Sequence, residues 1–209
     1  MIYEEIRPRL QTGDVILFSG RGIISDTIRA ITRSRWSHVG LVYCVPERDL
    51  VLSWESTTLC PLSDVDAGRA VKGVQLVPLS ARVATYPGQV AVRLLDWKRD
   101  PDRLAYLDQF RKQAQGRPYE LHILELVLAA IAGNRTEDAQ SLFCSELAAA
   151  SYQALNLLPD DPLADNYRPC DFSTEQTRLA RRLTAGATLG PEILLSAAQT
   201  VAALEAGPG

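Results

Sequence analysis

The stretch Phe143-Cys144-Ser145-Glu146 decides the fold expected of this chain, because an apolar helix is predicted to follow it. Small and apolar residues continue to Leu155, which favours a helix over residues 145–156. Cys144 would then stand at the first turn of that helix, where the positive end of the helix dipole favours thiolate over thiol. A small buried hydrophobic residue is the alternative interpretation of a cysteine. Among the four cysteines, Cys44, Cys60, Cys144 and Cys170, only Cys144 opens a predicted helix.

The chain contains two histidines, and they differ in their predicted surroundings. His38 follows Ser37 at the start of an alternating apolar run, which predicts an imidazole at the end of a strand. His122 lies inside an apolar stretch, residues 121–132, and is interpreted as a boundary residue of a helix. A pair of Cys144 and His38 would match the nucleophile and general base of thiol hydrolases.

A general-base histidine needs a third group that orients its ring, and Glu55 is the candidate. Residues 39–45 and 51–55 are predicted to form a hairpin, with a turn centred near residues 47–48. Partners in this hairpin would have residue numbers that add to about 95. Glu55 would then lie one step from His38 on the same face, since side chains alternate along a strand. A solvated strand carboxylate is the alternative for Glu55.

The order of the predicted elements indicates the α+β class, an antiparallel sheet or barrel with segregated helices. Strands dominate the first half of the chain, and helices dominate the second half. The predicted strands are residues 15–18, 39–45, 51–55, 74–79 and 89–95. The predicted helices are residues 25–32, 101–115, 121–132 and 145–156, one capped by Ser173 or Thr174, and a C-terminal segment from Pro191.

Composition excludes several function classes. The net charge of −3 gives no reason to expect a nucleic-acid partner. No CxxC pair and no His, Cys and Asp cluster with ligand spacing occurs, so no metal and no cofactor is implied. The apolar stretch 121–132 is too short to cross a bilayer. The acidic start of the chain lacks the basic region of a signal peptide, so a cytoplasmic location is expected. The arginines at 29, 33 and 35 are interpreted as a solvated helix face rather than an anion site.

Several sequence blocks together resemble the circularly permuted papain-like amidases of the NlpC superfamily. The blocks run in one order from about residue 10 to residue 173. They are Leu10-Gln11-Thr12-Gly13-Asp14-Val15-Ile16-Leu17-Phe18, Ser37-His38-Val39-Gly40-Leu41-Val42, Glu55-Ser56, Gly116-Arg117-Pro118-Tyr119-Glu120, Phe143-Cys144-Ser145-Glu146-Leu147 and Arg168-Pro169-Cys170-Asp171-Phe172-Ser173. The resemblance implies one permuted papain-like catalytic domain, placed over residues 1–190. The segment that begins at Pro191 is predicted to be a C-terminal helical tail over residues 191–209.

The resemblance also implies roles for the three polar residues. Cys144 would be the nucleophile, His38 the base and Glu55 the orienting group, with a thioester intermediate and no cofactor. The backbone N–H of Cys144 is the expected first oxyanion donor, and side chains near Ser37 or Tyr43 are candidates for oxyanion or substrate binding.

The expected substrate is an amide in a peptide, a cell-wall peptide or an N-acyl amide. Two alternatives stay open at this point. One is lipid-directed acyl transfer or acyl hydrolysis, as in lecithin-retinol acyltransferase relatives, with residues 121–132 covering an acyl chain. The other is a binding module that keeps the fold without turnover. The sequence does not indicate an oligomeric state.

Overall fold

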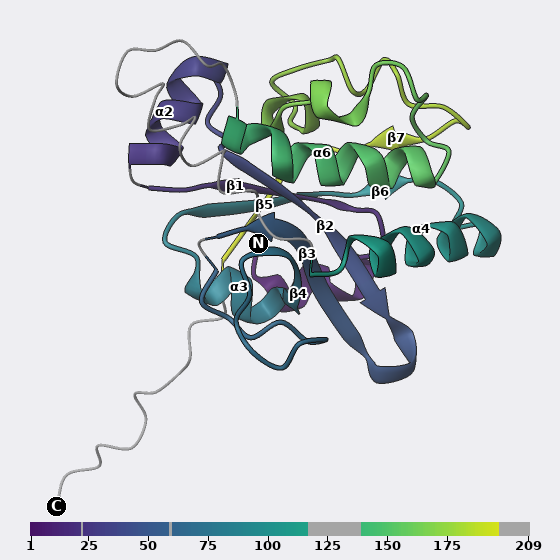
Figure 1. Cartoon of the computed structure of the whole chain (residues 1–209), viewed down its shortest axis with the longest axis horizontal. Helices are drawn as coiled ribbons and strands as arrows, with labels where there is room; N and C mark the ends of the chain where they lie inside the picture. The colour runs from purple at the N-terminus through teal and green to yellow at the C-terminus, as the bar shows by residue number, and fades with distance from the viewer. Residues whose placement is uncertain (22, 59, 117–138, 197–209) are drawn as a thin grey trace, which may run out of the picture.

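A six-stranded antiparallel sheet forms the centre of the computed structural model, which describes residues 1–21, 23–58, 60–116 and 139–196 (Figure 1). The strand order is β4-β3-β2-β1-β5-β8. The strands are β1 (Val15–Ser19), β2 (His38–Val45), β3 (Leu50–Thr57), β4 (Gly73–Pro78), β5 (Gln89–Arg93) and β8 (Ile193–Leu195). Within the described residues β4 and β8 are the two edges, so the sheet is open and not a barrel. A second, two-stranded sheet pairs β6 (Leu95–Asp96) with β7 (Thr188–Leu189).

The predicted hairpin register is confirmed. Leu41 pairs with Trp54 and Val45 pairs with Leu50, so the residue numbers of partners add to 95. The short 3-10 helix η2 (Pro46–Arg48) forms the connection between β2 and β3, and Asp49 follows it with a positive φ of 50°. This register determines how the candidate site residues His38 and Glu55 are placed, because it fixes which side chains of β2 and β3 share a face.

Both faces of the sheet are buried, which explains why β1 is a continuous apolar run. Val15 and Leu17 belong to one core cluster, whereas Ile16 and Phe18 belong to a second cluster on the other face. Helix α6 (Ala139–Ala154) packs on β2 and β3 in the first cluster, and α3 (Leu79–Thr85) packs on β3 and β4 from the other side (Figure 1).

The remaining elements lie around this three-layer arrangement. Asp100 caps α4 (Pro101–Ala114) by accepting hydrogen bonds from the backbone N–H groups of Asp102 and Arg103, as expected for a helix that starts at Asp-Pro. The others are α1 (Tyr3–Ile6), α2 (Ile23–Thr32), and the 3-10 helices η1 (Arg7–Arg9), η3 (Ala164–Asn166) and η4 (Pro169–Phe172). None of the described helices is long and apolar enough to span a membrane.

Three helix predictions need comment. The helix predicted over residues 121–132, with His122, lies outside the described residues. The helix predicted after Ser173 is wrong: Ser173 accepts a hydrogen bond from the N–H of Glu175, but the chain beyond it runs in turns to β7. The helical tail predicted from residue 191 is wrong at residues 193–195, which form β8. All three residues pair with β5, and Ile193 and Leu195 pack on the second core cluster, so burial against a strand outweighs their helix propensity.

Candidate functional site

His38 and Glu55 are brought together by the β2–β3 register. The Nε2 atom of His38 lies 2.6 Å from Oε2 of Glu55. Gly40 stands opposite Glu55, and a Cβ atom there would lie 3.2 Å from the Cβ of Glu55 and 3.1 Å from the Trp54 carbonyl oxygen. Glycine at position 40 therefore leaves the space in which the buried carboxylate reaches the imidazole. The geometric prediction for Glu55 is confirmed.

Cys144, on helix α6, completes the cluster. Its side chain hydrogen-bonds with His38, although the two residues are far apart in sequence. Because Nε2 of His38 is held by Glu55, the other ring nitrogen, Nδ1, is left for the sulfur. Cys144 is 2% exposed, whereas the His38 side chain keeps 16% of its surface exposed. The imidazole is thus the member of the cluster through which protons can exchange with solvent.

The electrostatics of His38 follow from these contacts. Burial alone would lower the pKa of His38, but the negative charges and hydrogen bonds of Cys144 and then Glu55 outweigh it and raise the pKa to about 9. At neutral pH the imidazole is therefore held as a cation between a sulfur and a carboxylate. This charge state is the one required for a thiolate–imidazolium pair.

Glu55 is itself held by two residues that the sequence did not point to. Arg82, in α3, donates from Nε to Oε1 at 2.7 Å and from its terminal NH2 to Oε2 at 3.0 Å. Ser53 donates from Oγ to Oε1 at 3.2 Å. Burial would raise the pKa of Glu55, but the charge of Arg82 and the hydrogen bond from His38 lower it to about 2. The orienting group is an ionised carboxylate over the whole working range of pH.

A weak signal for Arg82 exists in the sequence. Leu79, Arg82 and Val83 lie on the buried stripe of α3 at spacings of three and four residues. A charged residue on such a stripe is rarely buried without a partner. The sequence does not show which element carries that partner.

The position of Cys144 within its helix differs from the prediction. Helix α6 begins at Ala139, so Cys144 lies in its second turn and not at its first. Beyond the first four residues of a helix, each backbone N–H bonds within the helix. The Cys144 N–H is therefore not available as the expected oxyanion donor, and His38 rather than the helix terminus is the positive partner of the sulfur.

Two side chains fix α6 over the sheet. Ser145 donates from Oγ to the carbonyl of Tyr167 at 2.5 Å, and the hydroxyl of Tyr152 donates to the carbonyl of Gly13 at 2.8 Å. Both groups are buried. The Ser145 bond joins the helix that carries Cys144 to the segment before η4, and the Tyr152 bond joins it to the Gln11-Thr12-Gly13-Asp14 turn before β1, which therefore belongs to the same structural unit as the site.

Ser37 lies beside the cluster but is engaged in backbone contacts. Its Oγ accepts from the N–H of Gly20 at 3.2 Å and donates to the carbonyl of Phe18 at 3.4 Å. It also hydrogen-bonds with the hydroxyl of Tyr86, and Cys144 is among the groups that raise the pKa of that hydroxyl. Burial, only partly offset by Arg82, raises the pKa of Tyr86 to about 12, so this hydroxyl stays protonated. Tyr86 is thus a donor near the site that the sequence analysis missed.

Tyr43 does not belong to the site. It lies five residues beyond His38 along β2, a separation of about 16 Å at the rise of a strand. Its side chain packs on the α6 side of the sheet, with the first core cluster, and its hydroxyl donates to Asp108 of α4 at 2.8 Å. The predicted role of Tyr43 in oxyanion or substrate binding is therefore wrong for this structure. An odd residue number on β2 already places Tyr43 on the opposite face from His38.

The other three cysteines have different surroundings. Burial is the largest influence on the thiols of Cys44, Cys60 and Cys170, and it raises the pKa of each, that of Cys170 to about 11. In the described structure the four cysteines form no disulfide. Among the described residues, Cys144 is the cysteine that contacts a histidine.

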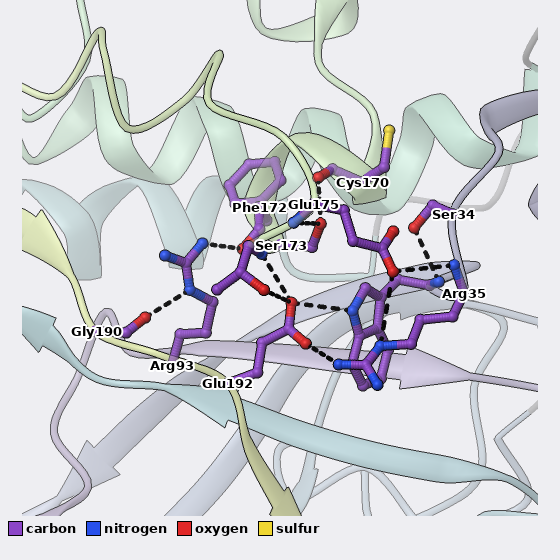
Figure 2. Close-up of polar contacts among 11 residues, drawn as sticks. Ser34, Arg35, Arg93, Cys170, Phe172, Ser173, Glu175, Gly190 and Glu192 are labelled. Atoms are coloured by element: carbon purple, nitrogen blue, oxygen red, sulfur yellow. Dashed lines mark hydrogen bonds and ion pairs between the residues drawn. The ribbon is translucent and has the colours of Figure 1, made fainter.

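A buried carboxylate also holds the segment that leads into β2. Figure 2 shows Glu192 at the centre of contacts that involve Arg35 and the chain around Ser173. Glu192 accepts from Nε1 of Trp36 at 3.1 Å and from the N–H of Thr174 at 2.7 Å, and it forms an ion pair with Arg35. Arg35 therefore has a structural role, and Trp36 is fixed two residues before His38.

A cavity of about 460 Å³ lies elsewhere, between α4 and α6. Its lining is rich in amides, and the part on α6 begins at Gln153, nine residues beyond Cys144 and about 14 Å along the helix. The lining residues are Tyr106, Gln109, Phe110, Gln113, Gln153, Ala154 and Asn156. Among the described residues no group of three or more His, Cys, Asp or Glu side chains is arranged to hold a metal ion.

Comparisons with known proteins name no family for this chain. Neither a family model nor a curated protein matches it. Among solved structures it is similar to the metalloprotein yiiX from Escherichia coli O157:H7, with 23% sequence identity and a TM-score of 0.47. The match covers 69% of this chain and 65% of yiiX, so the chain spans less than two thirds of that protein's length.

Proposed function

We propose that this protein is a cysteine hydrolase with a permuted papain-like domain, which cleaves an amide in a peptide, a cell-wall peptide or an N-acyl amide. The observation that carries the proposal is the hydrogen-bonded series from Cys144 through His38 to Glu55, closed by a 2.6 Å contact between imidazole and carboxylate. A nucleophile, a base within hydrogen-bond reach and a third group that orients the base are the features by which such sites are identified.

Each residue then has a defined task. The Cys144 thiolate attacks the carbonyl carbon of the amide, and the C–N bond breaks as His38 donates its proton to the leaving amine. The acyl group is left on sulfur as a thioester. His38, now neutral, takes a proton from water, and the resulting hydroxide attacks the thioester and releases a carboxylic acid. Glu55 keeps the imidazole in place and stabilises its cationic form in both steps.

The oxyanion formed in each step needs a hydrogen-bond donor. The hydroxyl of Tyr86 is the side chain we assign to this task, since burial keeps it protonated; to serve the oxyanion it would turn from Ser37 Oγ toward the substrate. Removing one oxyanion donor costs about 100-fold or more in turnover in well-studied hydrolases. Tyr86→Phe should therefore lower kcat while leaving the alkylation of Cys144 unchanged.

The first test is the reactivity of Cys144. The protein is treated with limiting iodoacetamide over a pH series, and mass spectrometry reports each cysteine separately. We expect Cys144 to be labelled well below pH 8, ahead of Cys44, Cys60 and Cys170, and we expect His38→Ala to abolish this selectivity. Cys44 is the internal control because it is only half-buried.

Turnover is then measured on acyl amides and peptidoglycan peptides, with Cys144→Ser as the inactive control. Labelling of Cys144 no faster than that of Cys44, or unchanged without His38, would refute the proposal and favour a binding module. The lipid-directed alternative was predicted from residues 121–132, which lie outside the described structure. N-acyl amides of increasing chain length test it in the same assay.

A further inference from the structure

The contact between Arg82 and Glu55 is a two-pronged ion pair inside the protein. Its two hydrogen bonds measure 2.7 Å and 3.0 Å, within the usual range of about 2.7–3.2 Å for N–H···O bonds in proteins. The side chains are 3% and 0% exposed, respectively. The guanidinium also lies over the rings of Phe18 and Tyr86, at 5.0 Å and 4.9 Å from their centroids. The guanidinium of Arg82 is therefore held in one position by Glu55 and by the two rings, and it is shielded from solvent.

This fork determines the orientation of the carboxylate. Oε2 of Glu55 accepts from His38 and Arg82, and Oε1 accepts from Arg82 and Ser53. Each oxygen thus has two partners, so the plane of the carboxylate cannot rotate without breaking a bond to a buried cation. Since His38 bonds to one of these oxygens, the position of its ring depends on Arg82 through Glu55.

The net charge of the cluster also requires a cation such as Arg82. In the reactive state Cys144 and Glu55 are anions and His38 is a cation, so these three groups carry one net negative charge. Burying an uncompensated charge is costly, and a protein avoids it by changing the protonation state of one of the groups. The guanidinium of Arg82 brings the sum to zero, and it does not lose its proton.

The groups that face this cluster come from several elements. They are His38 from β2, Glu55 from β3, Cys60 from the loop after β3, Arg82 from α3, Tyr86 at the end of α3 and Cys144 from α6. Of these, Cys60 and Tyr86 are neutral near pH 7, since burial raises the pKa of both. Arg82 is therefore the cation that balances Glu55 once His38 is paired with the thiolate.

We propose that Arg82 is a positioning residue of the site, which fixes the orientation of Glu55 and supplies the positive charge that lets a buried thiolate, imidazolium and carboxylate exist together. The inference rests on the proposed function, because it assigns Cys144 and His38 to an ion pair. Arg82 acts through Glu55 and through the field of the cluster.

The proposal predicts shifts of opposite sign for two substitutions. Arg82→Met removes the cation, so the pH midpoint of Cys144 alkylation should rise by about one unit. Glu55→Gln removes the anion and keeps Arg82, so the midpoint should fall, although turnover drops because the imidazole is less well oriented. A residue with a structural role alone would not move the two midpoints in opposite directions.

Two further variants separate charge from geometry. The double variant Glu55→Gln with Arg82→Met restores a neutral cluster, so its midpoint should lie between those of the two single variants. Because Glu55 and Arg82 are in direct contact, the departure of the double variant from the sum of the single shifts measures the coupling within the pair. Arg82→Lys keeps the charge and loses the fork, so we expect a wild-type midpoint with kcat reduced about tenfold or more. Circular dichroism and urea unfolding establish that each variant is folded.

The outcomes distinguish this inference from the proposed function. If wild-type labelling of Cys144 does not depend on His38, the proposed function itself fails. If that dependence holds but Arg82→Met leaves the midpoint unchanged, only the role of Arg82 is overturned. Should Arg82→Met not fold, the double variant decides: a midpoint as low as that of Glu55→Gln alone would show that Arg82 contributes no charge to the site.

Discussion

Replacing Glu192 by alanine tests how the structure holds the start of β2. The Glu192 side chain is 4% exposed and accepts hydrogen bonds from Trp36 and Thr174 while it pairs with Arg35. Trp36 is fully buried and lies two residues before His38. Glu192→Ala removes the acceptor from all three partners at once (Figure 2).

The expected loss can be worked out contact by contact. The Nε1–H of Trp36 would be left buried without its acceptor, which costs about 1–3 kcal/mol. Thr174 is exposed, so its N–H and hydroxyl can turn to water, and losing these bonds costs about 0.5–1 kcal/mol. The Arg35 side chain is 45% exposed, so its ion pair contributes about 0.5 kcal/mol after solvent screening. We expect a total of about 2–4.5 kcal/mol.

Urea unfolding followed by tryptophan fluorescence measures this loss, since the midpoint should fall while the slope with denaturant stays unchanged. The matched control is Glu175→Ala. Glu175 meets the same arginine at 3.6 Å and is 31% exposed, so its removal should cost less than about 1 kcal/mol. Equal losses in the two variants would mean that Trp36 gains nothing from Glu192.

The same experiment has a pH dependence with a defined sign. Burial would raise the pKa of Glu192, but its hydrogen bonds from Thr174 and its pairing with Arg35 lower it. A carboxylate with a lowered folded-state pKa contributes stability above its unfolded pKa of about 4.3, and this contribution is lost as pH falls through the folded value. The gap between wild type and Glu192→Ala should therefore narrow below about pH 4. A loss under 1 kcal/mol at pH 7, or a gap that widens in acid, would refute the reasoning.

Three further outcomes follow from other contacts. Tyr43→Phe should cost about 1 kcal/mol in urea unfolding and leave the alkylation of Cys144 unchanged, because the Tyr43 hydroxyl serves α4; slower labelling would return Tyr43 to the site. Asp14→Asn should lower the free energy of unfolding by about 2–4 kcal/mol. The buried carboxylate accepts from the N–H groups of Leu95 and Gln11, at 2.9 Å each, and the NH2 group of an asparagine would face one of these N–H donors. The pKa of His38 is raised from 6.5 to about 9, so its contribution to stability is complete below pH 6.5 and is lost as pH rises toward 9; a His38→Ala variant measured by urea unfolding should lack that decline.

The parts of the site that could be predicted depend on local periodicity. The alternation of side chains and the length of one turn were enough to place Glu55 on the same face as His38, because a hairpin register has few solutions once its turn is known. The same rule places Tyr43 on the α6 side of the sheet, and its position five residues beyond His38 along β2 is what separates it from the site. Local sequence patterns were therefore enough to predict the pairing of His38 with Glu55, which lies within one hairpin.

The parts that could not be predicted depend on where a helix begins and on what meets it in space. Helix boundaries are the least reliable result of pattern analysis, and α6 starts at Ala139, six residues before the predicted 145–156 segment. That shift removes the helix terminus as an electrostatic partner of Cys144 and leaves the imidazole of His38, which the sequence had also predicted. The sheet order likewise turned residues 193–195 into β8, because an edge strand beside β5 covers apolar surface that a helix there would leave open.

The contact between Glu55 and Arg82 explains why a charged third residue is tolerated at all. In the proposed mechanism, a carboxylate at 0% exposure cannot stay ionised with one histidine as its sole counter-charge, because the same histidine would also balance a thiolate. A neutral amide at position 55 could orient the ring without any counter-ion. An ionised glutamate there needs a second cation from another element, and α3 supplies it with Arg82. An ionised glutamate at position 55 therefore requires the buried arginine on α3, and the role of Glu55 has to be interpreted together with Arg82.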